Sequence, residues 1–195
     1  MNTTKIIRML AVVLLLCIGV FFFISGVDRK KTTSNEVPVF DGKNSTFVIE
    51  GTNTTLVNGI SQTNTTPDSA SKTITRYFGN EVSGDLNGNG LADIAFLVTQ
   101  DRSGSGLFYY AVVALKNKSG YTITNTFFIG DRIAPQSTTI DANTKELLIN
   151  FAERKPNEAM TAEPTVGATV RLKITAEGRL EKSTPSSVDN SPIVL

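Results

Sequence analysis

Oxygen-bearing side chains recur at alternate positions in the stretch SGDLNGNGLADIAFLV, residues 83–98. Six positions define the pattern: Asp85, Asn87, Asn89, Gly90, Leu91 and Asp93. Side chains spaced in this way can curl around one hard cation, because Gly90 permits a sharp bend and the carbonyl of Leu91 adds a further ligand. The residues therefore predict a metal site whose ligands come from Asp85, Asn87, Asn89, Leu91 and Asp93.

Calcium (Ca2+) is the ion that this ligand set favours. It accepts roughly six to eight oxygen ligands in irregular geometry, whereas Mg2+ demands a tighter octahedron and zinc prefers nitrogen or sulfur. The ligands carry a formal charge of only −2 and include no bidentate Glu, so we expect weak affinity, on the order of 10⁻⁴–10⁻³ M, which suits an extracellular site. The alternative is a plain wide turn, since Asn and Gly both tolerate positive φ.

Catalytic chemistry has few residues to work with. The chain contains no His and a single Cys, Cys17, so it cannot form a Ser-His-Asp triad, a Cys-His pair or a His-ligated zinc site. Asp131 and Glu153 could supply a carboxylate pair for glycoside hydrolysis. With Arg132, Arg154 and Lys155 they could instead form a polar recognition patch, or serve only as turn residues and exposed ion pairs. We expect a protein that is not an enzyme.

The segment that fixes the protein's location is MLAVVLLLCIGVFFFISGV, residues 9–27, which contains no charge. As a helix of 19 residues it would span about 28 Å, close to the roughly 30 Å hydrocarbon core of a bilayer. It predicts one transmembrane helix after a short N-terminal tail, residues 1–8. Three fates stay open: a retained anchor, cleavage after Gly26, and lipid modification of Cys17. Basic residues flank both ends, so charge alone does not set the orientation.

Residues 28–45 are polar and without periodicity, which predicts a linker, and residues 183–195 predict a flexible C-terminal tail. Residues 46–182 are rich in short β-type segments and turn signals, so we expect an antiparallel β domain, either a sandwich or a curved sheet. Asn58-Gly59 between TTLV and ISQT is a hairpin signal of type I′.

Three apolar segments differ in how they should be buried. ADIAFLVTQ and LFYYAVVALK are apolar on both alternating faces, which predicts central strands that are covered on both sides. In VGATVRLKIT, apolar positions alternate with Gly, Thr, Arg and Lys, which predicts one core-facing side and one solvent-facing side. The acidic stretch of residues 85–93 should therefore join a strand to one of the central strands.

The sequence DLNGNGLAD resembles the Asp-x-Asp-x-Asp-Gly-x-x-Asp calcium loops of FG-GAP repeats, VCBS repeats and dockerins. GDLNGNGLADIAFLV leads directly into an apolar strand and is closest to the FG-GAP/VCBS setting. The resemblance implies side-chain ligands at Asp85, Asn87, Asn89 and Asp93 and a backbone ligand at Leu91. Asn replaces Asp at the third and fifth positions. The whole layout also resembles a group of singly membrane-anchored bacterial β proteins with such a loop, which implies a location but no activity.

Together these features predict a membrane-anchored extracytoplasmic β module that binds a partner or has a structural role. Its contact with the membrane would be through residues 9–27, and its partner would be an envelope protein or a surface glycan. A small cell-surface hydrolase lacking His and an accessory subunit of an envelope complex are the alternatives. The formal net charge of +1 gives no reason to expect a nucleic-acid partner.

Overall fold

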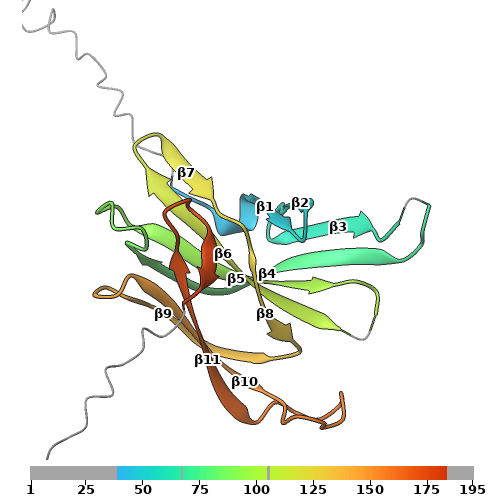
Figure 1. Cartoon of the computed structure of the whole chain (residues 1–195). Helices are drawn as coiled ribbons and strands as arrows, with labels where there is room; N and C mark the ends of the chain where they lie inside the picture. Colours follow the sequence, from blue (N-terminus) through green and yellow to red (C-terminus); the bar gives the residue numbers. More distant parts are fainter. Residues whose placement is uncertain (1–38, 67, 105, 184–195) are drawn as a thin grey trace, which may run out of the picture. The chain divides into compact units, whose positions relative to one another are not determined.

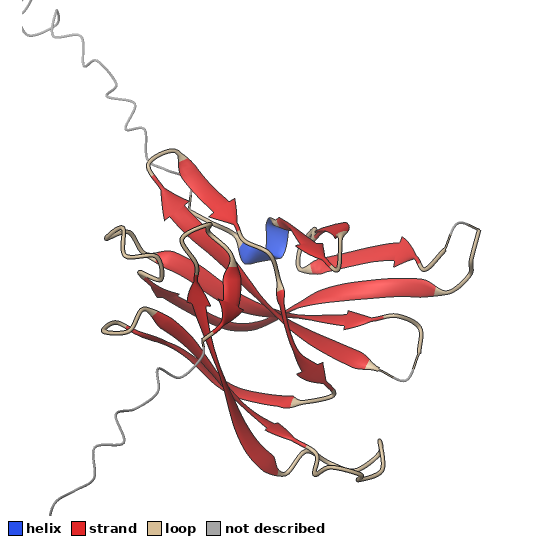
Figure 2. Ribbon diagram, in the orientation of Figure 1, coloured by secondary structure: helices blue, strands red, loops and turns tan. Residues whose placement is uncertain are grey.

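The computed structural model describes residues 39–66, 68–104 and 106–183. Strands make up almost all of its regular structure, and the only helical element in this part of the chain is a 3₁₀ turn, η1 (Gly42–Asn44) (Figure 2). All strand pairs are antiparallel, which confirms the predicted mainly β, antiparallel class. The predicted anchor, residues 9–27, lies outside the described residues. Within them, no helix has the length and apolar character needed to cross a membrane.

The strands are numbered in chain order and labelled in Figure 1 where space allows. Their bounds are β1 (Thr46–Ile49), β2 (Thr52–Thr55), β3 (Ile60–Asn64), β4 (Lys72–Gly84), β5 (Asp93–Asp101), β6 (Leu107–Asn117), β7 (Gly120–Ile123), β8 (Phe127–Asp131), β9 (Ala134–Asp141), β10 (Glu146–Glu153), β11 (Val166–Ile174) and β12 (Leu180–Lys182).

The strands form three sheets. The largest has the order β3-β4-β5-β6-β7, and β8 also pairs with β6, along a different part of that strand from β7. The second sheet has the order β12-β11-β10-β9, and β1 and β2 form a two-stranded sheet. Most neighbours in a sheet follow one another in sequence, so short turns specify most of the pairing.

Strands β5 and β6 form the middle of the large sheet and are buried along most of their length. One face contributes to a core cluster shared with the four-stranded sheet: Ala95, Leu97, Tyr109, Ala111 and Val113. The other face contributes to a second cluster, packed against the β1–β2 hairpin: Phe96, Val98, Tyr110 and Val112. This confirms the predicted burial of both strands on both faces, and it explains why their sequences are apolar at odd and even positions alike.

The four-stranded sheet covers the first cluster with one face only. Val170 and Leu172 of β11 are buried in that cluster, while the intervening Arg171 and Lys173 are exposed. This alternation confirms the one-sided burial predicted for β11. Its first residue, Val166, is an exception because it remains 37% exposed at the end of the strand.

Residues 40–45, the last part of the segment predicted to be a linker, pack onto the large sheet. The ring of Phe40 lies 6.0 Å from that of Phe96 and 5.2 Å from that of Tyr121. Gly42 is buried in η1, and the carboxylate of Asp41 caps this turn by accepting the N–H of Lys43. The folded unit therefore includes residues N-terminal to β1.

The turn predicted at Asn58-Gly59 is present, but the hairpin around it is not regular. Both residues have positive φ, 53° and 85°, as a type I′ turn requires. Val57 and Ile60 pair in an isolated bridge, and beyond them the chains separate: β2 stays with β1, and β3 joins β4. The hairpin signal at Asn58-Gly59 thus corresponds to a turn closed by a single bridge. Leu56 is 1% exposed in the second core cluster, so burial of this side chain holds β2 with β1.

Candidate functional site

The acidic loop connects two adjacent strands of the large sheet. β4 ends at Gly84 and β5 begins at Asp93, and these two residues are paired in register. Asp85 and Asp93 therefore lie at the two ends of one loop, as the sequence predicts.

Asp85 organises the loop through its carboxylate. One carboxylate oxygen accepts the backbone N–H groups of Gly88 and Asn89 at 2.8 and 3.1 Å. The other accepts the N–H of Gly90 at 3.2 Å and lies 3.2 Å from the ammonium of Lys145. Desolvation acts to raise the pKa of Asp85, but the hydrogen bonds from Lys145, Gly90 and Gly88 outweigh it and lower the pKa. Asp85 is thus a charged acceptor that folds the loop around itself.

Asp93 differs from Asp85 because its side chain is fully buried. Its two oxygens accept the backbone N–H groups of Leu86 at 2.9 Å and Lys116 at 2.8 Å. Desolvation raises the pKa of Asp93, and the nearby charge of Asp85 adds to this effect. The carboxylate therefore ties the acidic loop to the end of β6.

The two Asn residues of the pattern make local turns. The side-chain oxygen of Asn87 accepts the N–H of Asn89 at 3.1 Å, and that of Asn89 accepts the N–H of Leu91 at 2.8 Å. The amide of Asn89 also donates to the carbonyl of Lys116 at 2.9 Å. Such side-chain bonds to the backbone two residues ahead are the usual means by which Asn shapes a turn.

The oxygen atoms of this loop are ligands that suit Ca2+, but an ion would compete with Lys145 for one of them. All the side-chain acceptors are oxygens, and each carboxylate or amide oxygen that already accepts an N–H retains a second lone pair. Lys145, however, already supplies a positive charge to Asp85, from the turn between β9 and β10. An ion that used both oxygens of Asp85 would have to displace this ammonium. Among the described residues, no group of three or more His, Cys, Asp or Glu side chains is placed to bind a metal.

The second predicted cluster comes together only in part. Asp131 and Arg132 lie at the bend between β8 and β9 and form an ion pair of 2.7 Å. Arg154 reaches this bend and donates to the carbonyls of both residues at 3.2 and 3.3 Å. Glu153 is exposed at the end of β10, and Lys155 pairs instead with Glu158. Arg132 has a positive φ of 49°, and the contacts of Arg132 and Arg154 with Asp131 hold this strained bend.

A polar groove, which the sequence reasoning missed, opens where β2 and β3 separate. We call it the β2–β3 groove, and its volume is about 270 Å³. Hydroxyl side chains dominate its walls: Thr52, Thr54, Ser61, Thr63, Thr65, Thr73 and Thr75. The amides of Asn53, Asn64 and Gln100 complete the walls with Ile49, Glu50 and Arg102.

The floor of the groove is a polar continuation of an apolar sheet face. Ser61 pairs with Thr75, Thr75 pairs with Gln100, and Thr63 pairs with Thr73 across the strands. Gln100 lies on the same face of β5 as Phe96 and Val98, which pack against the β1–β2 hairpin. Residues paired across strands share a face, so all five polar residues face the β1–β2 side. Thr75 and Gln100 are 2% and 6% exposed, and the Gln100 amide donates to the Thr75 hydroxyl at 3.2 Å.

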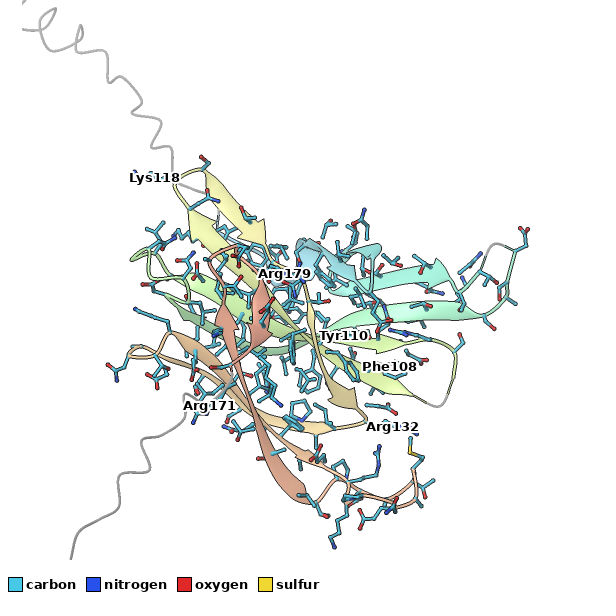
Figure 3. All side chains as sticks on the ribbon, in the orientation of Figure 1. Phe108, Tyr110, Lys118, Arg132, Arg171 and Arg179 are labelled. Atoms are coloured by element: carbon cyan, nitrogen blue, oxygen red, sulfur yellow. The ribbon has the colours of Figure 1, made fainter. Side chains whose placement is uncertain are left out.

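A neutralised charge pair closes one end of the groove. The guanidinium of Arg102 lies 2.9 Å from the carboxylate of Glu50 and donates to the Tyr110 hydroxyl at 2.7 Å, which in turn donates to Glu50 at 2.7 Å. Arg102 also donates to the Gln100 amide oxygen at 2.7 Å and stacks 4.8 Å from the centre of the Phe108 ring. Figure 3 shows Phe108 and Tyr110 near one another beside β8. The hydrogen bonds from Arg102 and Tyr110 lower the pKa of Glu50.

One sequence signal could have indicated this groove. Ser and Thr recur in TNTT, ISQTNTT and KTIT, three segments that read as ordinary β-rich stretches. Alternate hydroxyl positions on successive strands predict a polar sheet face, but only if the strands are known to be neighbours. Gln100 and Arg102 come from a distant part of the sequence, so their place in the groove depends on the pairing of β4 with β5.

Comparison with protein-family models, curated proteins and solved structures found no match for this chain.

Proposed function

We propose that this protein is a non-catalytic binding module on the extracytoplasmic side of a membrane, anchored through residues 9–27, and that the β2–β3 groove is its binding site. The observation that carries the proposal is the polar floor of the groove, in which Thr75 and Gln100 are buried and Ser61, Thr63 and Thr73 lie beside them. Burying hydroxyl and amide groups costs free energy unless they are hydrogen-bonded. Thr75 and Gln100 meet this cost by hydrogen-bonding to each other, and the hydroxyls of Ser61, Thr63 and Thr73 beside them extend a polar surface that suits a polar ligand.

The residues at the groove support binding more than chemistry. Glu50 is paired with Arg102 and has a lowered pKa, so it is poorly suited to deliver a proton. The other polar groups of the walls are hydroxyls and amides without a neighbouring His, since the chain contains none. Hydroxyls both donate and accept hydrogen bonds, which suits recognition of a neutral polar ligand.

We propose Ca2+ as a structural ion of the acidic loop rather than a participant in binding. The loop joins β4 to β5, and both strands also contribute residues to the groove floor. An ion at Asp85, Asn87, Asn89, Leu91 and Asp93 would stabilise the register of these strands from the end opposite to Thr75 and Gln100. Its effect would appear as stability of the domain.

The test of the binding site uses the full-length protein in detergent and two probes, a phage-displayed library of random dodecapeptides and an array of neutral oligosaccharides. Ser61→Trp fills the groove from β3, and Thr139→Trp places the same side chain at an exposed position of β9. We expect ligands from one probe whose affinity falls at least tenfold in Ser61→Trp and stays within twofold in Thr139→Trp. Equal binding by both variants, or no binder from either probe, would remove the groove as the functional site.

A further inference from the structure

We propose that the ligand of the β2–β3 groove is an extended, uncharged peptide segment that adds as a strand to the outer edge of β2. This inference rests on the proposed function and names the class of ligand. It follows from the direction of the backbone groups of β2, from the polar floor next to them, and from the charge of the groove.

Within the part of the chain that the structure describes, the outer edge of β2 presents unpaired backbone groups. Ile49 and Thr52 flank a two-residue turn, and Leu56 donates its N–H to the carbonyl of Ser45. Hydrogen-bonded and non-hydrogen-bonded pairs alternate in an antiparallel hairpin, so the N–H and C=O groups of Asn53 and Thr55 point away from β1. Both residues are exposed, and in the described part of the chain β2 has no strand neighbour besides β1.

The outward groups of Asn53 and Thr55 do not pair with β3 because β2 and β3 diverge beyond the Val57–Ile60 bridge. Had β2 and β3 continued to pair beyond Val57 and Ile60, Thr55 would face Gln62 and Asn53 would face Asn64. The edge therefore has the hydrogen-bonding pattern of a strand whose neighbour is missing. A peptide supplies N–H and C=O groups with the same two-residue repeat, which is the basis of recognition by strand addition.

An added strand would run over the groove floor. Its side chains would alternate between solvent and the floor, where they would meet the hydroxyls of Ser61, Thr63 and Thr73. The groove volume of about 270 Å³ is below the roughly 300–1,000 Å³ of typical small-molecule pockets. The polar floor favours small or hydroxyl-bearing side chains beneath the main chain, and the rest of the ligand would continue along the exposed edge.

Charge and ring content argue for the same ligand. Glu50 and Arg102 neutralise each other at one end, and the other residues of the walls are uncharged, so the groove offers no partner for a charged side chain. Among the described residues, no aromatic ring lines the groove to pack against the apolar face of a sugar, and the ring of the neighbouring Phe108 is covered by the guanidinium of Arg102. A peptide is therefore favoured over an oligosaccharide.

The test separates the backbone of Asn53 from its side chain. Asn53→Pro removes the outward N–H, a change that edge strands tolerate, whereas Asn53→Ala removes the side chain and keeps the N–H. A dodecapeptide selected from the phage library would be synthesised with normal peptide bonds and with N-methyl groups on alternate residues. With full-length protein in detergent, we expect Asn53→Pro and N-methylation each to weaken binding at least tenfold, and Asn53→Ala, which loses only the side-chain contact with the groove, to weaken it at least threefold less than Asn53→Pro does.

Amide hydrogen exchange of the unmodified protein followed by NMR provides a measurement that does not depend on a variant. The peptide should slow exchange of the Asn53 and Thr55 amides at least tenfold. Unchanged exchange at both amides, equal binding of the N-methylated peptide, or binding of the oligosaccharide array in place of peptides would overturn strand addition. If Ser61→Trp still abolishes binding in any of these cases, the groove remains the binding site and only the ligand class is wrong.

Discussion

The two aspartates that end the acidic loop have different physical roles. Asp85 is accessible to a neighbouring ammonium, while Asp93 is fully buried and accepts the N–H groups of Leu86 and Lys116. A loop that bound an ion through both residues would therefore use one carboxylate that also ties the loop to β6.

Replacing Asp93 should destabilise the protein even without calcium. Asp93→Ala leaves the backbone N–H groups of Leu86 and Lys116 without their buried acceptor, and each loss costs about 1–3 kcal/mol. We expect a fall of about 2–4 kcal/mol in the free energy of unfolding, measured by urea denaturation in EDTA. Asp85→Ala is the matched control and should cost less, since its acceptors serve an exposed turn. A smaller loss for Asp93→Ala than for Asp85→Ala would contradict the buried role.

Calcium should raise the melting temperature of the protein, and Lys145 should limit the effect. Free Ca2+ at ten times its dissociation constant adds about 1.4 kcal/mol of stability, or about 5 °C for a domain of this size. Lys145→Met removes the ammonium that competes for Asp85, so its calcium-induced rise should be larger than that of the original protein. Differential scanning calorimetry would measure both.

Asp85→Ala and magnesium are the controls for this experiment. The substitution should abolish the calcium-induced rise, and Mg2+ should reproduce it poorly because it requires stricter octahedral geometry. An unchanged melting temperature up to 10 mM Ca2+, together with no heat of binding, would leave the loop as a turn closed by Lys145.

At the scale of elements, the short η1 turn packs closely on the large sheet through Gly42. A Cβ atom at Gly42 would lie 2.9 Å from Cε2 of Tyr77 and 3.4 Å from Cε1 of Phe96. Gly42→Ala should therefore cost about 1–3 kcal/mol through overpacking. Gly104→Ala is the control, because a Cβ there meets nothing within 4 Å. Equal urea midpoints for the two variants would show that η1 does not pack on the large sheet.

The strands also show which features local sequence signals predict and which they do not. Apolar patterning predicted β5, β6 and β11 with the correct faces. A strand buried on one face alternates apolar and polar residues, and a strand buried on both faces is apolar at successive positions. The Asn58-Gly59 signal predicted a turn with positive φ, yet it could not predict how long the strands on either side stay paired. That outcome depends on whether Leu56 packs in the core with β1, a contact between elements.

At the scale of the whole molecule, the β domain should fold without the N-terminal residues. Among the described residues, its two core clusters draw on side chains between Phe40 and Leu180. We expect a fragment of residues 40–185 to be soluble and monomeric, with a circular dichroism spectrum dominated by β structure. A mainly helical spectrum would contradict the fold, and aggregation of the purified fragment would contradict its independence.

The proposed location is tested by topology. Because residues 9–27 are long and apolar enough to span a bilayer, we expect the full-length protein in the membrane fraction with residues 28–195 outside. Protease added to intact cells should then remove the β domain. Complete protection, with degradation only after lysis, would place the domain on the other side of the membrane.

The sequence by itself determined the mainly β class, the central strands and the position of the acidic loop between β4 and β5. These features depend on near-neighbour patterns: alternation along one strand, and turn residues between successive strands. Only the tertiary structure decided that Lys145 pairs with Asp85, and that Gln100 and Arg102 meet Ser61 and Thr63 at one groove. Those pairs are far apart in the chain, and their proximity follows from which strands pair and which apolar side chains are buried together. The partner of β2 is also decided by tertiary packing: β2 pairs with β1 rather than with β3, and the groove lies where β2 and β3 separate.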